Sequence, residues 1–287
     1  MRGNFAYLRP RTIDEALDLK SRTENSRYIA GGTDLLVRMK EHREDPAALI
    51  SLRRVAELSG VSENGTIRLG TASTIADCLA NSTLTSRLPV LAAAMARMGS
   101  VQIRNTATVG GNLCTASPCA DTAPPLLVLG ARLVFRNAAS GREEEIPLDQ
   151  FFIAPRQTRL AAHDLATALI IDPPSPSART IFFKKTRVRM DLALASVAVL
   201  LELDGKRCVK VRVAAGSVAP TPRRLEAVEQ LLTGQLLTPE ILRHAEQLAR
   251  DSVAPICDLR AGDDYRRHVT GVYVRRAIEL LLAGKQS

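Results

Sequence analysis

The chain has 287 residues, of which 46% are hydrophobic and 24% charged. At typical domain sizes of roughly 100–200 residues, this composition indicates one large or two modest domains and excludes fibrous, disordered and disulfide-scaffold proteins. The longest nearly apolar stretch, 192–201, is interrupted by Ser196 and is about half as long as the roughly 20 residues of a membrane helix. We therefore expect no membrane span. Because the first residues contain no apolar signal segment, we expect a cytoplasmic protein.

The formal net charge of the chain is +9, and only 3% of the residues are aromatic. The arginines are spread along the whole sequence, from Arg2 to Arg276. A nucleic-acid-binding protein usually concentrates basic residues in one patch and adds aromatic residues for stacking on single strands. The pattern therefore favours solvated charged faces over a nucleic-acid site, and a docking surface for an acidic partner stays open as an alternative.

The first half of the chain predicts short strands and helices in turn. Thr12 followed by Glu15 is typical of a helix N-terminus, and Asn64-Gly65 is typical of the bend of a hairpin. The expected strands cover 5–8, 27–30, 48–52, 66–70 and 132–135, and the expected helices lie near 12–19, 35–40, 55–58, 74–79, 88–98 and 126–131.

A Pro- and Ser-rich stretch at 172–177 is typical of a linker or of a crossing between domains. Three helices are expected to close the chain, and the second starts at Thr238 with Pro239 at the first helical position. Between the stretch and these helices we expect strands at 180–183, 194–203 and 208–213, and the last helix covers about 264–282.

Two double glycines, Gly31-Gly32 and Gly110-Gly111, are the only ones in the sequence, and each follows a strand-like segment. A diphosphate needs backbone N–H groups brought close to it without an intervening Cβ, and a helix start adds partial positive charge. Both segments are expected to offer these features. A single double glycine is more often only a turn, but two of them followed by hydroxyl or amide side chains favour one shared ligand.

The segment 106–122 around the second double glycine combines small, hydrogen-bonding residues in an otherwise apolar context. Such a segment can wrap closely around a polar cofactor. Asp121 near its end has a structural alternative, in which its side chain caps the helix that contains Pro124.

This segment strongly resembles the second flavin-binding motif in the FAD subunits of molybdenum hydroxylases, the xanthine dehydrogenase and carbon monoxide dehydrogenase family. The segment 30–35 resembles the pyrophosphate loop of the same family. The resemblance covers essentially the whole chain, because it also includes 7–10 with 15–17, 183–193, 216–222 and 258–267.

The resemblance implies an α+β fold. A two-subdomain FAD-binding (PCMH-type) domain would cover 1–175, with subdomains of about 1–55 and 56–175. A C-terminal α+β domain with an antiparallel sheet and three helices would cover 178–287. The FAD would lie extended between the N-terminal subdomains and the C-terminal domain.

The resemblance also implies which residues hold the cofactor. The loop at 31–36 would hold the pyrophosphate, with help from the second double glycine. The expected cofactor-binding residues are Ala30, Gly31, Gly32, Thr33, Asp34, Leu35 and Leu36 in the first loop, Thr108, Gly110, Gly111 and Asn112 in the second, Thr115, Ser117 and Asp121 beside the flavin and ribityl chain, Leu165 against the ring, and Lys185.

Lys185 matches a lysine of the family, and Lys184 is the alternative register. Two-electron reduction leaves negative charge near N1 and the C2 carbonyl of a flavin, so a fixed cation there raises the reduction potential. The two lysines could instead be solvated residues at the end of a strand.

No metal site is expected in this chain. The five cysteines are irregularly spaced and form no CxxC pair, which favours reduced thiols over disulfides or an iron–sulfur cluster. The four histidines show no HExxH or other metal-binding spacing. The sequence also lacks GxGxxG and GxxxxGK[ST], which argues against Rossmann and P-loop proteins.

By the resemblance, the chain is the FAD-binding medium subunit of a molybdenum hydroxylase, a heterotrimer or a dimer of heterotrimers. A molybdopterin-binding large subunit would oxidise the substrate, and a small subunit with [2Fe-2S] clusters would pass electrons to FAD and on to an acceptor such as NAD. No side chain of this chain is expected to be catalytic. Two other classes stay open, a stand-alone FAD-dependent oxidoreductase of the same cofactor fold and a basic binding protein without a cofactor.

Overall fold

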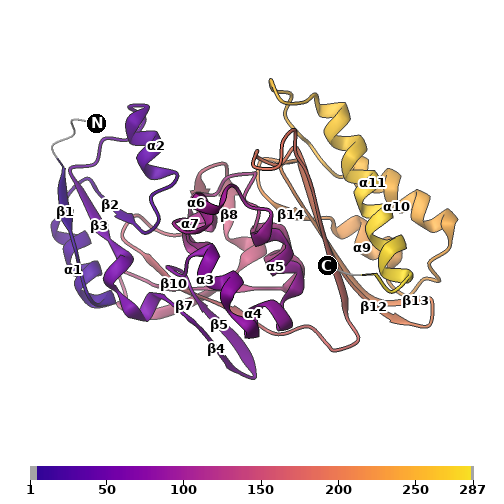
Figure 1. Cartoon of the computed structure of the whole chain (residues 1–287), viewed down its shortest axis with the longest axis horizontal. Helices are drawn as coiled ribbons and strands as arrows, with labels where there is room; N and C mark the ends of the chain where they lie inside the picture. The colour runs from indigo at the N-terminus through magenta and orange to yellow at the C-terminus, as the bar shows by residue number, and fades with distance from the viewer. Residues whose placement is uncertain (1–4, 286–287) are drawn as a thin grey trace.

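A computed structural model describes residues 5–285, in which three main sheets follow one another along the molecule (Figure 1). The first sheet is parallel, and its order places the strand expected at 5–8 on an edge. It consists of β1 (Ala6–Leu8), β3 (Ala48–Ser51) and β2 (Ser26–Ile29), in that order, with the helices α1 (Ile13–Arg22) and α2 (Leu35–Lys40) in the same part of the chain.

The second sheet has five antiparallel strands and forms the middle of the molecule (Figure 1). Its order is β4 (Val61–Asn64), β5 (Thr66–Gly70), β10 (Leu165–Ile171), β6 (Arg132–Arg136) and β7 (Glu143–Pro147). Between β5 and β6 the chain forms α3 (Ile75–Ala80), α4 (Ser82–Arg87), α5 (Pro89–Ala96), α6 (Val101–Arg104), α7 (Val109–Cys114) and α8 (Ala123–Leu129). A small hairpin of β8 (Phe152–Ala154) and β9 (Gln157–Thr158) precedes β10.

The third sheet is antiparallel, and the last three helices cover its outer face (Figure 1). Its order is β11 (Arg179–Lys185), β12 (Ala195–Asp204), β13 (Arg207–Gly216) and β14 (Arg223–Arg224), and the helices are α9 (Glu226–Leu232), α10 (Pro239–Asp251) and α11 (Asp263–Leu282). The Pro- and Ser-rich stretch at 172–177 carries the chain from β10 to β11. The expected α+β class with an antiparallel C-terminal sheet and three helices is confirmed.

Local signals in the sequence explain several of these boundaries. Thr12 accepts a hydrogen bond from the N–H of Glu15 at 3.1 Å, as expected for the residue that caps α1. Gly65 turns the β4–β5 hairpin with φ at +73°, a conformation that glycine adopts readily. Thr238 caps α10, and the next residue, Pro239, is the first of that helix.

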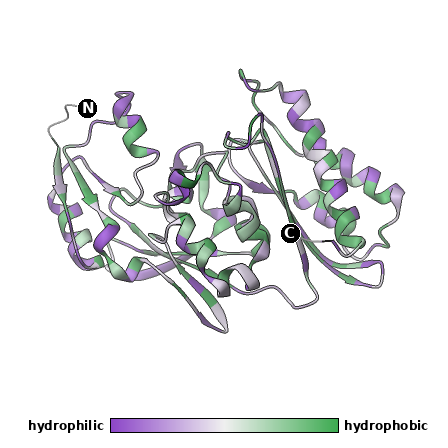
Figure 2. Cartoon of the chain, viewed as in Figure 1, coloured by the Kyte–Doolittle hydropathy of each residue, from purple (hydrophilic) through white to green (hydrophobic). Residues whose placement is uncertain are grey.

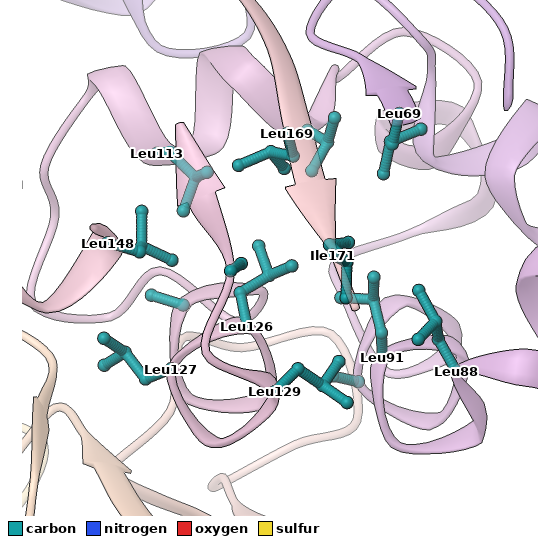
Figure 3. Close-up of a cluster of buried hydrophobic side chains, with 14 of the residues drawn as sticks. Leu69, Leu88, Leu91, Leu113, Leu126, Leu127, Leu129, Leu148, Leu169 and Ile171 are labelled. Carbon is teal, nitrogen blue, oxygen red and sulfur yellow. The ribbon is translucent and has the colours of Figure 1, made fainter. Parts of the chain in front are cut away.

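Both faces of β12 are buried from Ala195 to Leu201, which joins the two halves of the chain. Val197 and Val199 of β12 belong to the core under the C-terminal helices. Ala198 and Leu200, which point the other way, belong to the core of the second sheet and its helices. Figure 3 shows this second core around α5, α8 and β10. Because neither face meets water, the sequence of β12 is almost continuously hydrophobic, as Figure 2 shows.

Candidate functional site

The two double glycines lie at one cleft, which we call the glycine cleft. It has a volume of about 590 Å³ and lies between the β2–α2 turn and the start of α7. A Cβ added to Gly31 would be 2.2 Å from the carbonyl oxygen of Thr106, the first residue of the segment 106–122. Only a residue without a side chain allows this approach. Most of the predicted residues line the cleft, namely Ala30, Gly31, Gly32, Thr33, Asp34, Leu35, Thr108, Gly110, Gly111, Asn112, Thr115 and Leu165.

The first glycine turn presents unpaired backbone donors. Within residues 5–285, none of the N–H groups from Gly31 to Leu35 donates a hydrogen bond to another residue of the chain, whereas the N–H of Leu36 already bonds to the carbonyl of Gly32. Backbone N–H groups rarely go without a partner unless water or a ligand meets them. A run of such donors in a cleft is a suitable binding surface for an anion.

The second glycine turn differs from the expectation, because its backbone donors are already used within the fold. Gly110 donates to the carbonyl of Thr71 at 2.9 Å, and Gly111 donates to the hydroxyl of Thr108 at 3.1 Å. The N–H of Val109 likewise bonds to a carbonyl at 3.2 Å. This turn therefore contributes close approach and side chains to the cleft, whereas the run of unpaired backbone donors among the described residues belongs to the first turn.

Asn112 and Thr115 of the second motif reach the glycine cleft, but Ser117 and Asp121 do not line it. The Asn112 amide oxygen accepts hydrogen bonds from the backbone N–H and the hydroxyl of Thr122, which orients the amide group. Of the first motif, Leu36 points elsewhere and packs in a small cluster beneath the cleft.

Asp121 is buried and forms an ion pair with Lys184. The Lys184 Nζ atom is 2.7 Å from Asp121 Oδ2, and the two side chains are only 2% and 7% exposed. The other carboxylate oxygen, Oδ1, is buried without a hydrogen-bond partner among the described residues. The capping alternative is wrong, because the residue before α8 is Thr122 and no side chain caps that helix.

Lys184 also lines a second cavity of about 480 Å³, which we call the lysine cavity. Two consecutive residues line different cavities: Met98 lines the glycine cleft, and Gly99 lines the lysine cavity. The other residues around the lysine cavity are Ala96, Arg97, Arg104, Thr186 and Arg189.

The alternation of β11 decides which lysine faces Asp121. Successive side chains of a strand point to opposite faces, so Lys185 points away from Lys184. Lys185 lines neither cavity and lies near Tyr273 of α11, whose phenol pKa its charge lowers, although burial raises that pKa overall. Lys184 is therefore the lysine that pairs with Asp121, whereas the expectation that Lys185 lies beside the flavin stays a prediction.

Several residues of the glycine cleft had no signal in the sequence. Thr71 and Met98 come from connections between elements, and Arg38 lies inside α2. Arg156 comes from the β8–β9 hairpin, well beyond the end of the segment 106–122. They were missed because they share no motif and come together only in the folded chain.

Within the described part of the chain, no group of three or more His, Cys, Asp or Glu side chains is placed to hold a metal ion. Nor does that part contain a helix that is long and apolar enough to cross a membrane. All five cysteines are free thiols.

Comparison with known proteins identifies the family. Residues 3–174 match the family described as FAD binding domain in molybdopterin dehydrogenase, and residues 181–281 match the CO dehydrogenase flavoprotein C-terminal domain. The chain is 29% identical to the xanthine dehydrogenase FAD-binding subunit of Escherichia coli O157:H7, over 97% of this chain and 96% of that one. It is 30% identical to the carbon monoxide dehydrogenase medium chain of Afipia carboxidovorans, over 96% of both.

The fold leads to the same family. A chain of the carbon monoxide dehydrogenase from Hydrogenophaga pseudoflava superposes with a TM-score of 0.95 at 29% sequence identity, and the match covers 99% of both chains. The resemblance stated from the sequence is thus confirmed over nearly the whole length. The chain belongs to the FAD-binding subunits of the molybdenum hydroxylase family, the oxidoreductases of carbon monoxide dehydrogenase and xanthine dehydrogenase type.

Proposed function

We propose that this chain holds FAD along the glycine cleft and the lysine cavity and relays electrons through it, from [2Fe-2S] clusters on a partner subunit to an acceptor such as NAD. The observation that carries the proposal is the run of unpaired N–H groups from Gly31 to Leu35, which opens into a cleft that two double glycines form. Such a surface suits the diphosphate that distinguishes FAD from FMN.

The residues present fit FAD at a second point. Asp121 Oδ1 is a buried acceptor without a partner, and a buried polar atom of this kind costs free energy unless a donor meets it. FAD carries donors on its ribityl chain and on its flavin ring. We therefore assign the diphosphate to the first glycine turn and the ribityl and flavin part to the end of the site near Asp121.

FAD supplies the capacity to accept electrons one at a time and to release two together. In this proposal the chain binds and orients the cofactor, and none of its side chains acts as an acid, base or nucleophile on a substrate. Lys184 and Asp121 form a fixed ion pair in a dry environment, and the ammonium is its positive end. Such a charge favours the reduced, negatively charged flavin and raises its potential.

The names of the relatives support the remaining parts of the proposal. One relative is called a medium chain of carbon monoxide dehydrogenase and another an FAD-binding subunit of xanthine dehydrogenase, so each belongs to a larger assembly. We propose a molybdopterin-binding large subunit and a [2Fe-2S] small subunit as partners, in a heterotrimer or a dimer of heterotrimers. The free cysteines are compatible with the cytoplasm.

Two measurements test the proposal. Flavin released by acid from the purified chain should be FAD when analysed by chromatography, and recovery of FMN alone would contradict the assignment of the diphosphate. The complex isolated through a tag on this chain should contain molybdenum and iron together with two further chains. An isolated chain that oxidises a substrate by itself would instead support the stand-alone oxidoreductase.

A further inference from the structure

Arg156 occupies an unusual position at the tip of the β8–β9 hairpin. Its φ angle is +65°, in the left-handed region that residues other than glycine seldom adopt. Its backbone N–H donates to the carbonyl of Ala116, in the second glycine motif, at 2.9 Å. This bond fastens the hairpin tip to the motif, and Arg156 is one of the residues that line the glycine cleft.

Arg156 is also the guanidinium of the cleft whose charge is not committed to an ion pair. Two other arginines line the cleft, and both bind Glu44, Arg27 at 3.1 Å and Arg38 at 2.7 Å. No described residue forms an ion pair with Arg156, although Asp34 across the cleft is near enough to feel its charge. The backbone of Arg156 is held in place and its guanidinium forms no ion pair with a described residue, so the guanidinium is suited to bind an anion that enters the cleft.

We propose that Arg156 is a further binding residue for the diphosphate of FAD, which it holds from the side of the second motif while the unpaired N–H groups at 31–35 hold it from the first. The proposal rests on FAD binding in this cleft. A guanidinium suits the task because its planar set of donors can bind two phosphate oxygens at once. It would also compensate for the second glycine turn, whose own N–H groups are already used.

A different role for Arg156 would be to balance the charge of Asp34. Burial raises the pKa of the Asp34 carboxyl above its usual range, and the charges of Arg156 and Arg38 oppose that rise. If Arg156 served only to balance the charge of Asp34, FAD binding would no longer need Arg156 once Asp34 is replaced by an uncharged residue. A double substitution therefore separates the two roles.

The experiment titrates FAD into the full-length apo chain and follows the change in flavin fluorescence. Arg156→Gln should weaken FAD binding by about 10- to 100-fold, the range for one lost hydrogen bond to a charged group. Arg159→Gln is the matched control, since Arg159 lies three residues further along, just after β9, is exposed and does not line the cleft. Arg156→Lys keeps the charge and should restore part of the affinity.

Two further measurements distinguish a diphosphate contact from a structural effect. The affinity of Arg156→Gln for FAD should depend less on salt than that of the wild type, because one charged contact is gone. The loss of FAD affinity caused by Arg156→Gln should persist when Asp34→Asn is also present. If Arg156 only balanced the charge of Asp34, the substitution Asp34→Asn would abolish this loss of affinity. Thermal unfolding of the apo variants checks that each one is folded.

Each outcome has a consequence for the proposal. Equal FAD affinities of Arg156→Gln and Arg159→Gln, an unchanged salt dependence, or rescue by Asp34→Asn would overturn the assignment of Arg156 and leave the proposed FAD site intact. A wild-type chain that fails to bind FAD at all would overturn the FAD site itself.

Discussion

Lys184→Met removes the one hydrogen bond that Asp121 accepts from the described residues. Both side chains are almost fully buried, so the carboxylate would be left as an unpaired charge away from water. Removing one partner of a buried ion pair costs about 3–5 kcal/mol. We expect the free energy of unfolding of the apo chain, measured by urea denaturation, to fall by about this amount.

Lys185→Met is the matched control, because it makes the same chemical change one residue away on the opposite face of β11. Its effect should be small, about 0.5 kcal/mol, as for most surface substitutions. Adding Asp121→Asn to Lys184→Met removes the unpaired charge and should recover most of the lost stability. If the double variant were as unstable as Lys184→Met alone, the buried charge would not be the cause.

The same variant tests the effect on the cofactor. One lost charge interaction of about 1.4–3 kcal/mol corresponds to about 30–65 mV for a two-electron couple, so Lys184→Met should lower the FAD potential by this amount. A dye-coupled redox titration of the FAD-loaded chain measures the shift. A shift in Lys185→Met alone would refute the assignment of the two faces, and no shift in either variant would refute the tuning role.

The other predictions concern the glycine cleft and the thiols. Gly31→Ala places a Cβ 2.2 Å from a backbone oxygen of the facing segment, so it should force the two motifs apart and abolish FAD retention on a gel-filtration column. Gly262→Ala, where an added Cβ meets nothing within 4 Å, should retain FAD like the wild type. If this variant also lost FAD, the close approach at Gly31 would not explain the loss in Gly31→Ala. Burial raises the pKa of the Cys78 thiol to about 12 and that of Cys208 to about 11, whereas Cys257 is exposed. Iodoacetamide at pH 8 followed by peptide mass spectrometry should therefore label Cys257 in the folded chain and the two buried thiols only after unfolding.

Local features of the structure could be predicted from the sequence because each depends on a few neighbouring residues. A hydroxyl that accepts the N–H three residues on stabilises the start of a helix, as at Thr12 and Thr238. The positive φ angle of Gly65 is likewise a local property of the hairpin. The two double glycines could be identified as parts of one site, since a shared ligand is the simplest reason for two such turns in one chain.

Other features depend on contacts between segments far apart in the sequence. β11 is buried on both faces along most of its length, so the pattern of hydrophobic residues does not show which way Lys184 points. The sequence therefore showed that Lys184 and Lys185 point to opposite faces of the strand. Which of the two faces Asp121, 63 residues earlier, was decided only by the packing of the strand.

Contacts between segments far apart in the sequence also explain why the two glycine turns differ and why Arg156 lies at the cleft. The N–H of Gly110 finds its acceptor in Thr71, on a connection 39 residues earlier, and nothing in the motif itself shows that this donor is used. Arg156 reaches the cleft because a backbone bond to Ala116 holds its hairpin there. The sequence by itself determined which two turns line the glycine cleft, because each turn is a local feature. Only the tertiary structure decided which donors and charges stay free to bind, because each polar group is paired or left unpaired by whatever segment packs beside it.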